Sequence, residues 1–182
     1  MEGWTEEEIM NKELRAPCGI FCGACAIYIS ARDENEKFRT LISSVWGTKP
    51  EETKCFGCMQ PDPPKQLFGF CQTCAIRSCI KSKGFYSCHQ CEIWPCDKTE
   101  NSELADVIPS QVRNSVLRVM KRSIPIWRAE VAEHGDEKGS VQWARGECER
   151  YHCPSCGKPL YRSAQHCRVC KTPVAEELDG VI

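Results

Sequence analysis

Sixteen cysteines in a chain of 182 residues constrain this sequence more than any other feature. Most of them occur in pairs separated by two residues, the C-x2-C spacing typical of metal-binding knuckles. The first residues lack the basic-then-apolar plan of a secretory signal, and no run of about 18 apolar residues occurs. We therefore expect a cytoplasmic protein without a membrane span, whose reduced cysteines bind metal rather than form disulfides.

The cysteines fall into two groups with a cysteine-free stretch between them. Eleven lie between Cys18 and Cys96, and five lie between Cys148 and Cys170. The expected fold is small, metal-stabilised and mainly α, with zinc knuckles and irregular loops, and it ends in a β zinc ribbon. This distribution predicts four parts: a cysteine-rich metal-binding domain at 1–100, a helical segment at 101–150, a zinc ribbon at 151–175 and an acidic tail at 176–182.

Two helices are predicted near the N-terminus. Thr5 and Glu8 form a capping-box pattern before a short helix that ends ahead of Pro17. The stretch 33–46 is a second, amphipathic helix, and the run of prolines at 61–64 must lie in an irregular loop. The apolar face of the second helix is predicted to carry Phe38, Leu41, Ile42 and Val45.

The cysteine-free stretch predicts further helices. Residues 108–122 place Ile108, Val112, Val116, Val119 and Met120 on one stripe, with Pro109 in the first turn. Ile124-Pro125 is expected to end that helix. Gly135 and Gly139 bracket a second break, and a last short helix is expected at about 140–150.

The strongest metal motif lies near the C-terminus. It has the spacing C-x2-C-x10-C-x2-C and resembles the short zinc ribbons of bacterial proteins. Two facing knuckles present four thiolates tetrahedrally, which is the geometry of a structural zinc site. Cys148 stands outside this spacing, and we expect it to be a buried, small apolar residue. The predicted ligands are Cys153, Cys156, Cys167 and Cys170.

The N-terminal group contains an internal repeat, C-x2-C-x-Ile. We expect each copy to form a knuckle that leads into a helical turn, with the isoleucine packed inward. The helix start is expected to lower the thiolate pKa. The three copies are Cys22, Cys25 and Ile27; Cys71, Cys74 and Ile76; and Cys88, Cys91 and Ile93.

The N-terminal cysteines are one ligand short of three four-ligand sites. His89, inside the third knuckle, is the nearest candidate for the missing ligand, and His134 is the other. Together with the ribbon, these sites predict three to four zinc ions per chain. The N-terminal candidates are Cys18, Cys22, Cys25, Cys55, Cys58, Cys71, Cys74, Cys79, Cys88, Cys91 and Cys96.

The order and spacing of these motifs resemble a known family. The signature begins with the run from Ala16 to Tyr28, continues with Cys55-x2-Cys58, and ends with the second and third knuckles. Over about residues 14–100, it is similar to the bacterial and archaeal family called domain of unknown function 3795. The resemblance implies a small metal-binding domain, taken to bind zinc, with no established reaction.

The favoured function is a zinc protein with structural cysteine-rich sites that acts as a binding or adaptor module for a protein partner, rather than as an enzyme. The chain contains no P-loop and no G-x-S-x-G, G-x-G-x-x-G or H-E-x-x-H motif. One alternative is an iron–sulfur or thiol-based redox or metal-handling protein, with its cluster in the N-terminal domain.

A second alternative is a nucleic-acid-binding regulator that uses the basic residues of 108–122. The formal net charge of −1 opposes this function, and the thiolates of each zinc site would add negative charge. We expect the basic residues to meet acidic groups instead, either on a partner or within this chain. The tail residues Glu176, Glu177 and Asp179 are candidates for the second case.

Overall fold

The computed structural model describes residues 3–100, 110–174 and 178–179. The described chain is mainly helical, as predicted, and no helix in it is both long and apolar enough to cross a membrane. The helices are α1 (Glu6–Met10), α2 (Ala26–Arg32), α3 (Glu36–Trp46), α4 (Gly69–Gln72), α5 (Ala75–Ser82), α6 (Asp97–Glu100), α7 (Ser110–His134) and α8 (Asp136–Arg150), with 3₁₀ turns at Lys12–Leu14, Cys22–Ala24 and Cys88–Gln90.

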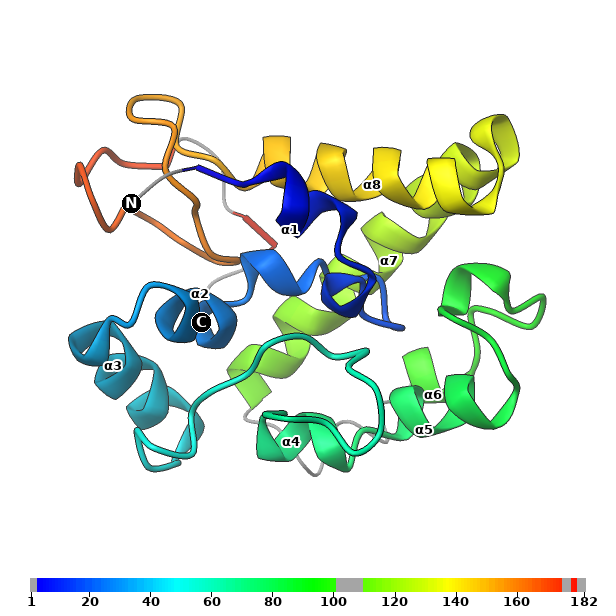
Figure 1. Cartoon of the computed structure of the whole chain (residues 1–182), viewed down its shortest axis with the longest axis horizontal. Helices are drawn as coiled ribbons and strands as arrows, with labels where there is room; N and C mark the ends of the chain where they lie inside the picture. Colours follow the sequence, from blue (N-terminus) through cyan, green and yellow to red (C-terminus); the bar gives the residue numbers. More distant parts are fainter. Residues whose placement is uncertain (1–2, 101–109, 175–177, 180–182) are drawn as a thin grey trace.

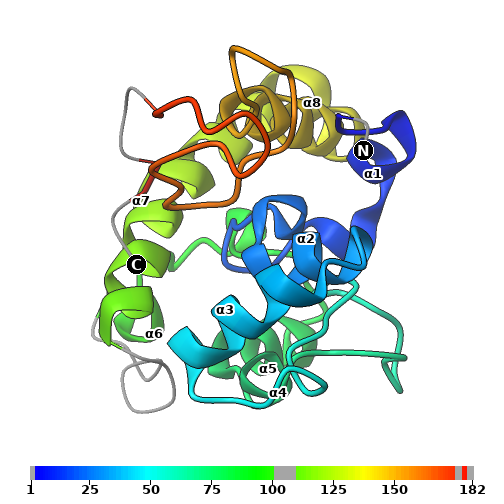
Figure 2. The same ribbon diagram turned by 90° about the vertical axis from the view of Figure 1, so that its left-hand side faces the viewer.

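Helix α7 runs diagonally through the molecule, and α8 folds back across it with α1 against its other side (Figure 1). The N-terminal cysteine-rich part forms the other half of the molecule, with α2 and α3 beside the C-terminal segment and α4 to α6 further away (Figure 2). Buried side chains of all these parts join one hydrophobic core, which includes Phe21, Trp127 and Leu160. The division into four parts therefore stays a prediction.

The predicted apolar stripe of α7 is confirmed, but its predicted end is wrong. Val112, Val119 and Met120 are at most 1% exposed, whereas Ile108 and Pro109 lie outside the described residues. Pro125 lies inside a helix that continues to His134. Proline removes one backbone hydrogen bond, but Pro125 itself is exposed, and the fully buried Trp127 anchors the turn after it.

The turn between α7 and α8 brings two tryptophans into contact. The rings of Trp127 and Trp143 stack with centroids 3.9 Å apart, and each indole N–H donates 2.8 Å to a serine hydroxyl of the opposite helix, Ser140 and Ser123 respectively. The predicted break at Gly135 is confirmed. Gly139, however, lies inside α8, which begins four residues earlier than expected.

The predicted N-terminal helices are confirmed. Thr5 and Glu8 form the capping box of α1, and α3 ends at Gly47, which adopts φ +64°. Phe38 and Ile42 are buried on α3, but Leu41 is 59% exposed, so the apolar face is narrower than its spacing suggests. The proline-rich stretch 61–64 is irregular, as expected.

The internal repeat holds for two of its three copies. Helices α2 and α5 begin directly after Cys25 and Cys74, and Ile27 and Ile76 are buried. The prediction is wrong for the third copy, because Ile93 is 66% exposed and no helix follows the knuckle directly.

The third knuckle is instead held through its backbone by a residue of α7. The guanidinium of Arg128 donates hydrogen bonds to the carbonyls of His89 and Cys91, at 3.0 and 2.6 Å. These bonds fix the knuckle on α7, so the isoleucine is not needed as its anchor.

The C-terminal segment forms two tight turns. Cys153 and Cys167 begin these turns, each receiving a backbone N–H four residues later, from Gly157 and Lys171. Within the described residues the segment contains two isolated bridges, His152 to Pro159 and His166 to Pro173, and no longer strand. The four-cysteine cluster is therefore present, while the β-ribbon remains an expectation.

The close crossing of α7 and α8 predicts a specific effect at Gly139. A Cβ atom there would lie 2.4 Å from the carbonyl oxygen of Glu130. This oxygen belongs to the backbone of α7, so it cannot move away easily. Gly139→Ala should lower the free energy of unfolding by about 1–3 kcal/mol. Gly146→Ala is the matched control on the same helix, because it meets nothing within 4 Å and should raise stability by about 0.5–1 kcal/mol. Denaturant titrations of both variants give the comparison, and equal effects would contradict the close crossing.

Candidate metal centre

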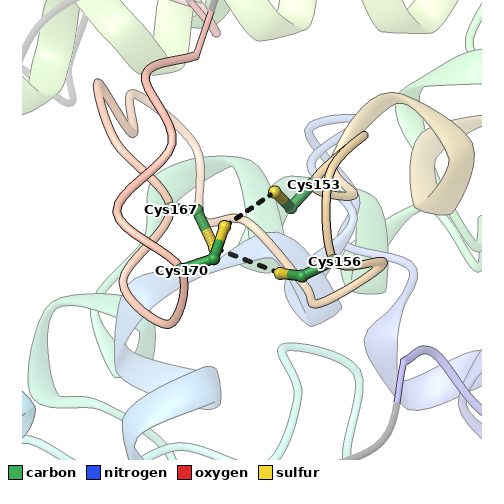
Figure 3. Close-up of side chains that lie close together, drawn as sticks. All are labelled: Cys153, Cys156, Cys167 and Cys170. Carbon is green, nitrogen blue, oxygen red and sulfur yellow. Dashed lines mark hydrogen bonds between the residues drawn. The ribbon is translucent and has the colours of Figure 1, made fainter.

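Four cysteines converge in the C-terminal segment (Figure 3). The sulfurs of Cys153 and Cys170 lie 3.5 Å apart, and those of Cys156 and Cys167 lie 3.6 Å apart. All four sulfurs lie within 4.8 Å of one another, so the structure brings together the four residues predicted as ribbon ligands. Cys153 and Cys167 are buried, whereas Cys170 is exposed.

The spacing of these sulfurs fits a single tetrahedral ion. Zn–S bonds of about 2.3 Å give a tetrahedron whose edges are about 3.8 Å long. The two measured separations are close to that edge. Four soft thiolates without an open position are also the donor set of a structural zinc site.

The four thiols differ in acidity. The hydroxyl and backbone of Thr172 hydrogen-bond the Cys170 sulfur and lower the pKa of Cys170 to about 6. The backbone of Lys158 acts in the same direction on Cys156, but burial and the three neighbouring thiols outweigh it and raise the pKa of Cys156 to about 12. One ligand is therefore preformed as a thiolate at neutral pH, and another must lose a proton when metal binds.

The C-terminal site is joined directly to the N-terminal part. The backbone N–H of Arg162 donates 2.9 Å to the carbonyl of Ala24, just before Cys25. The ring of Tyr161 contacts Phe38 of α3, with centroids 5.3 Å apart. The C-terminal site therefore packs next to the knuckle at Cys22 and Cys25.

Seven N-terminal cysteines surround a second feature, a cavity of about 120 Å³. Apolar and aromatic side chains such as Trp46, Phe68 and Val116 complete its wall, and Arg162 reaches it from the C-terminal segment. We call it the seven-cysteine cavity; its cysteines are Cys18, Cys22, Cys25, Cys55, Cys58, Cys71 and Cys74.

Thiols of this cavity are less acidic than predicted. Burial and neighbouring thiols raise the pKa of Cys22 well above its usual value and raise that of Cys55 to about 12. The expected lowering by a helix start is therefore wrong for Cys22, because desolvation outweighs the helix dipole. A cation in the cavity would supply the charge that thiolates need there.

Three of the other four N-terminal cysteines lie near Lys83. The Lys83 ammonium lies 3.4 Å from the Cys91 sulfur, and the thiols of Cys91, Cys79 and Cys96 raise the pKa of Lys83. Burial, followed by the same three thiols, raises the pKa of Cys88 to about 12. We call Cys79, Cys88, Cys91 and Cys96 the outer cysteines.

The two candidate histidines lie in different surroundings. The ring of His89 stacks on Trp127, and its Nε2 lies 3.0 Å from a carboxylate oxygen of Asp136. Burial lowers the pKa of His89 although Asp136 opposes that shift. His134 is near Glu130, with 3.5 Å between Nε2 and the carboxylate. That either histidine binds metal stays a prediction.

Cys148 lies on α8 and is 4% exposed, which confirms its expected burial.

One basic residue of α7, Arg122, pairs with acidic groups within the chain, including the tail residue Asp179, whereas Glu176 and Glu177 lie outside the described residues. Arg122 pairs with Glu147 at 2.5 Å and with Asp179 at 3.0 Å. Asp179 also accepts a hydrogen bond from the buried Tyr151 hydroxyl. Although burial raises it, the bonds from Tyr151 and Arg122 lower the pKa of Asp179, so the tail carboxylate stays charged.

Sequence reasoning missed two charged residues at the sulfur groups. Arg162 lies far from the N-terminal cysteines along the chain, and nothing in its local pattern indicates that it reaches their cavity. Lys83 lies between the second and third knuckles in the sequence. This position alone could have indicated a positive charge close to the thiols.

The comparisons with known proteins agree with the motifs. Residues 14–101 match the family described as protein of unknown function (DUF3795), which supports the resemblance over that segment. No match was found among curated proteins or among solved structures. Together with the sulfur geometry, the match describes a cysteine-rich protein with a candidate four-cysteine metal site.

The unequal acidity of the C-terminal thiols predicts how metal binding depends on pH. At pH 7 Cys170 is a thiolate and Cys156 a thiol, so zinc must displace a proton from Cys156. Zinc affinity at this site should rise about tenfold per pH unit for each proton released, and more steeply below pH 6, where Cys170 also takes up a proton. Competition with a chromophoric chelator between pH 5.5 and about 8.5 measures this dependence. An affinity independent of pH would contradict it.

Proposed function

We propose that this chain is a zinc-binding protein whose C-terminal cysteines hold one structural zinc ion. The observation that carries the proposal is the mutual separation of the four sulfurs, all within 4.8 Å, which fits a single tetrahedral ion. The segment contains little regular secondary structure, so a bound metal would supply most of its folding free energy. Of the three to four zinc ions predicted from the sequence, the geometry supports this one best.

We further infer a binding or adaptor role toward a protein partner in the cytoplasm. Sixteen free cysteines favour a reducing compartment, because an oxidising one would cross-link them. The contacts that the basic residues of α7 make within the chain favour a protein partner over nucleic acid. Arg122 is committed to Glu147 and Asp179, and Arg128 to the carbonyls of the third knuckle.

The first test removes one C-terminal ligand. Cys156→Ser should release about one zinc per chain, because three thiolates and a hydroxyl bind the ion far less tightly. Hydrogen exchange should become faster over 151–174, while residues 14–96 keep their protection. Native mass spectrometry measures the metal content, and Cys148→Ser is the control that should keep its zinc. Unchanged zinc in Cys156→Ser would contradict the site, and cooperative unfolding of the whole chain would contradict an independent C-terminal unit.

The second test concerns nucleic acid. At about 0.15 M salt, generic DNA and RNA should show no gel shift with micromolar protein, because each zinc held by four thiolates adds net negative charge. Binding that weakens when Arg118, Lys121 and Arg122 are changed to Ala would favour the nucleic-acid function instead. The triple change also removes the ion pairs of Arg122, so Arg118→Ala with Lys121→Ala is the control that leaves these pairs intact.

A further inference from the structure

The two sulfur-rich regions of the chain differ in spacing. At the C-terminal site all four sulfurs lie within 4.8 Å of one another. Among the described residues, which include every cysteine, no three sulfurs of the seven-cysteine cavity approach one another that closely. They are instead arranged around a space of about 120 Å³.

We propose that the seven-cysteine cavity holds one [4Fe–4S] cluster, with Cys71 and three of the six other cysteines as its ligands. The proposal goes beyond the structural zinc and does not depend on it. It assigns different metals to the two regions, a single ion to the C-terminal quartet and a cluster to the N-terminal cavity.

The spacing of the sulfurs distinguishes the two kinds of centre. Any three ligands of one tetrahedral zinc lie about 3.8 Å apart, which the cavity cysteines do not satisfy. In a [4Fe–4S] cluster each thiolate binds a different iron, so the inorganic core separates the four thiolates. Cysteines spread around a cavity are the arrangement that such a core requires.

The size of the cavity is also suitable. A cavity of about 150 Å³ in another protein accepts benzene, a ring of six heavy atoms held by van der Waals contact alone. The cluster core has eight atoms, but its four irons form bonds with sulfurs of the wall and so approach closer than contact distance. A space of about 120 Å³ therefore suits the core, whereas a zinc tetrahedron needs no cavity.

Cys71 is central among the seven cysteines. Its thiol lies close enough to those of Cys58, Cys25 and Cys74 to interact with each of them. The thiols of Cys22, Cys55 and Cys18 also lie near enough to Cys71 to interact with it. Cys71 therefore lies near all six other cysteines of the cavity, and this central position is the reason for its assignment as a ligand.

Arg162 also brings a positive charge to the wall of the cavity. Its side chain lines the cavity and the residue is 8% exposed. Its Nη1 donates 3.1 Å to Ser115, but its Nε is buried without a hydrogen-bond partner. A buried guanidinium beside thiols is poorly compensated, whereas a cluster bound by four thiolates offers it an anionic sulfur acceptor.

The test begins with the full chain purified under nitrogen. Analysis of metal and acid-labile sulfide should give about four irons and four sulfides per chain, together with about one zinc. The protein should be brown, with broad visible absorption from thiolate-to-iron charge transfer. Zinc and iron are counted in the same sample. The proposal of a cluster can therefore be contradicted while the proposal of a structural zinc stands, and the reverse.

Three variants place the cluster within the chain. Cys71→Ala should lose the iron, the sulfide and the visible absorption while keeping the zinc. Cys91→Ala removes one of the outer cysteines and should keep the iron of the cavity. Cys148→Ala is the control for changing a buried cysteine outside both regions.

Two results would overturn the proposal. The first is a colourless protein with two or more zinc ions and no iron, even after anaerobic incubation with ferrous iron, sulfide and thiol. The second is iron that survives in Cys71→Ala but is lost in Cys91→Ala, which would place the cluster at the outer cysteines. If Cys71→Ala does not fold, the composition of the unaltered chain still decides the first point, and Cys91→Ala decides the second.

Discussion

Three cysteine-bearing regions of the chain pack against helix α7, and the rest of the structure depends on this shared contact. Val116 of α7 forms part of the wall of the seven-cysteine cavity. Arg128, three turns further on, holds the backbone of the third knuckle. Ser115 bonds both Ser163 and Arg162 of the C-terminal segment, at 3.0 and 3.1 Å. Helix α7 thus fixes the positions of the three cysteine-bearing regions relative to one another.

Spacing along the chain does not specify which sulfurs meet in space. The C-terminal quartet closes within 18 residues, so its C-x2-C pairs have only each other as partners, and the sequence predicts the set directly. The cavity combines cysteines of residues 18–25, 55–58 and 71–74, with helices α2 and α3 between the first two groups and an irregular stretch between the last two. The same C-x2-C spacing therefore serves a compact tetrahedron in one region and a wide ring of sulfurs in the other.

Most helices could be predicted from local sequence patterns, because the residues that begin and end a helix act on their immediate neighbours. The capping box at Thr5 and the glycine after α3 act within one turn, and both are confirmed. The predictions failed where tertiary contacts override local preference. Pro125 is accommodated because Trp127 anchors the helix beyond it, and Gly139 is required by the neighbouring helix rather than by a turn. Ile93 matches the repeat but is exposed, because the third knuckle is held by hydrogen bonds from Arg128, a residue distant in the sequence.

The walls of the seven-cysteine cavity come from very different positions along the chain. Those that carry sulfur lie within residues 16–76, whereas Val116 and Arg162 are added from the long helix and the C-terminal segment. During synthesis the sulfur ligands therefore leave the ribosome well before the last two walls exist. A nascent chain therefore carries all seven cysteines before the residues that complete the wall have been synthesised. A metal centre bound at that stage would be enclosed only when residues 116 and 162 pack against it.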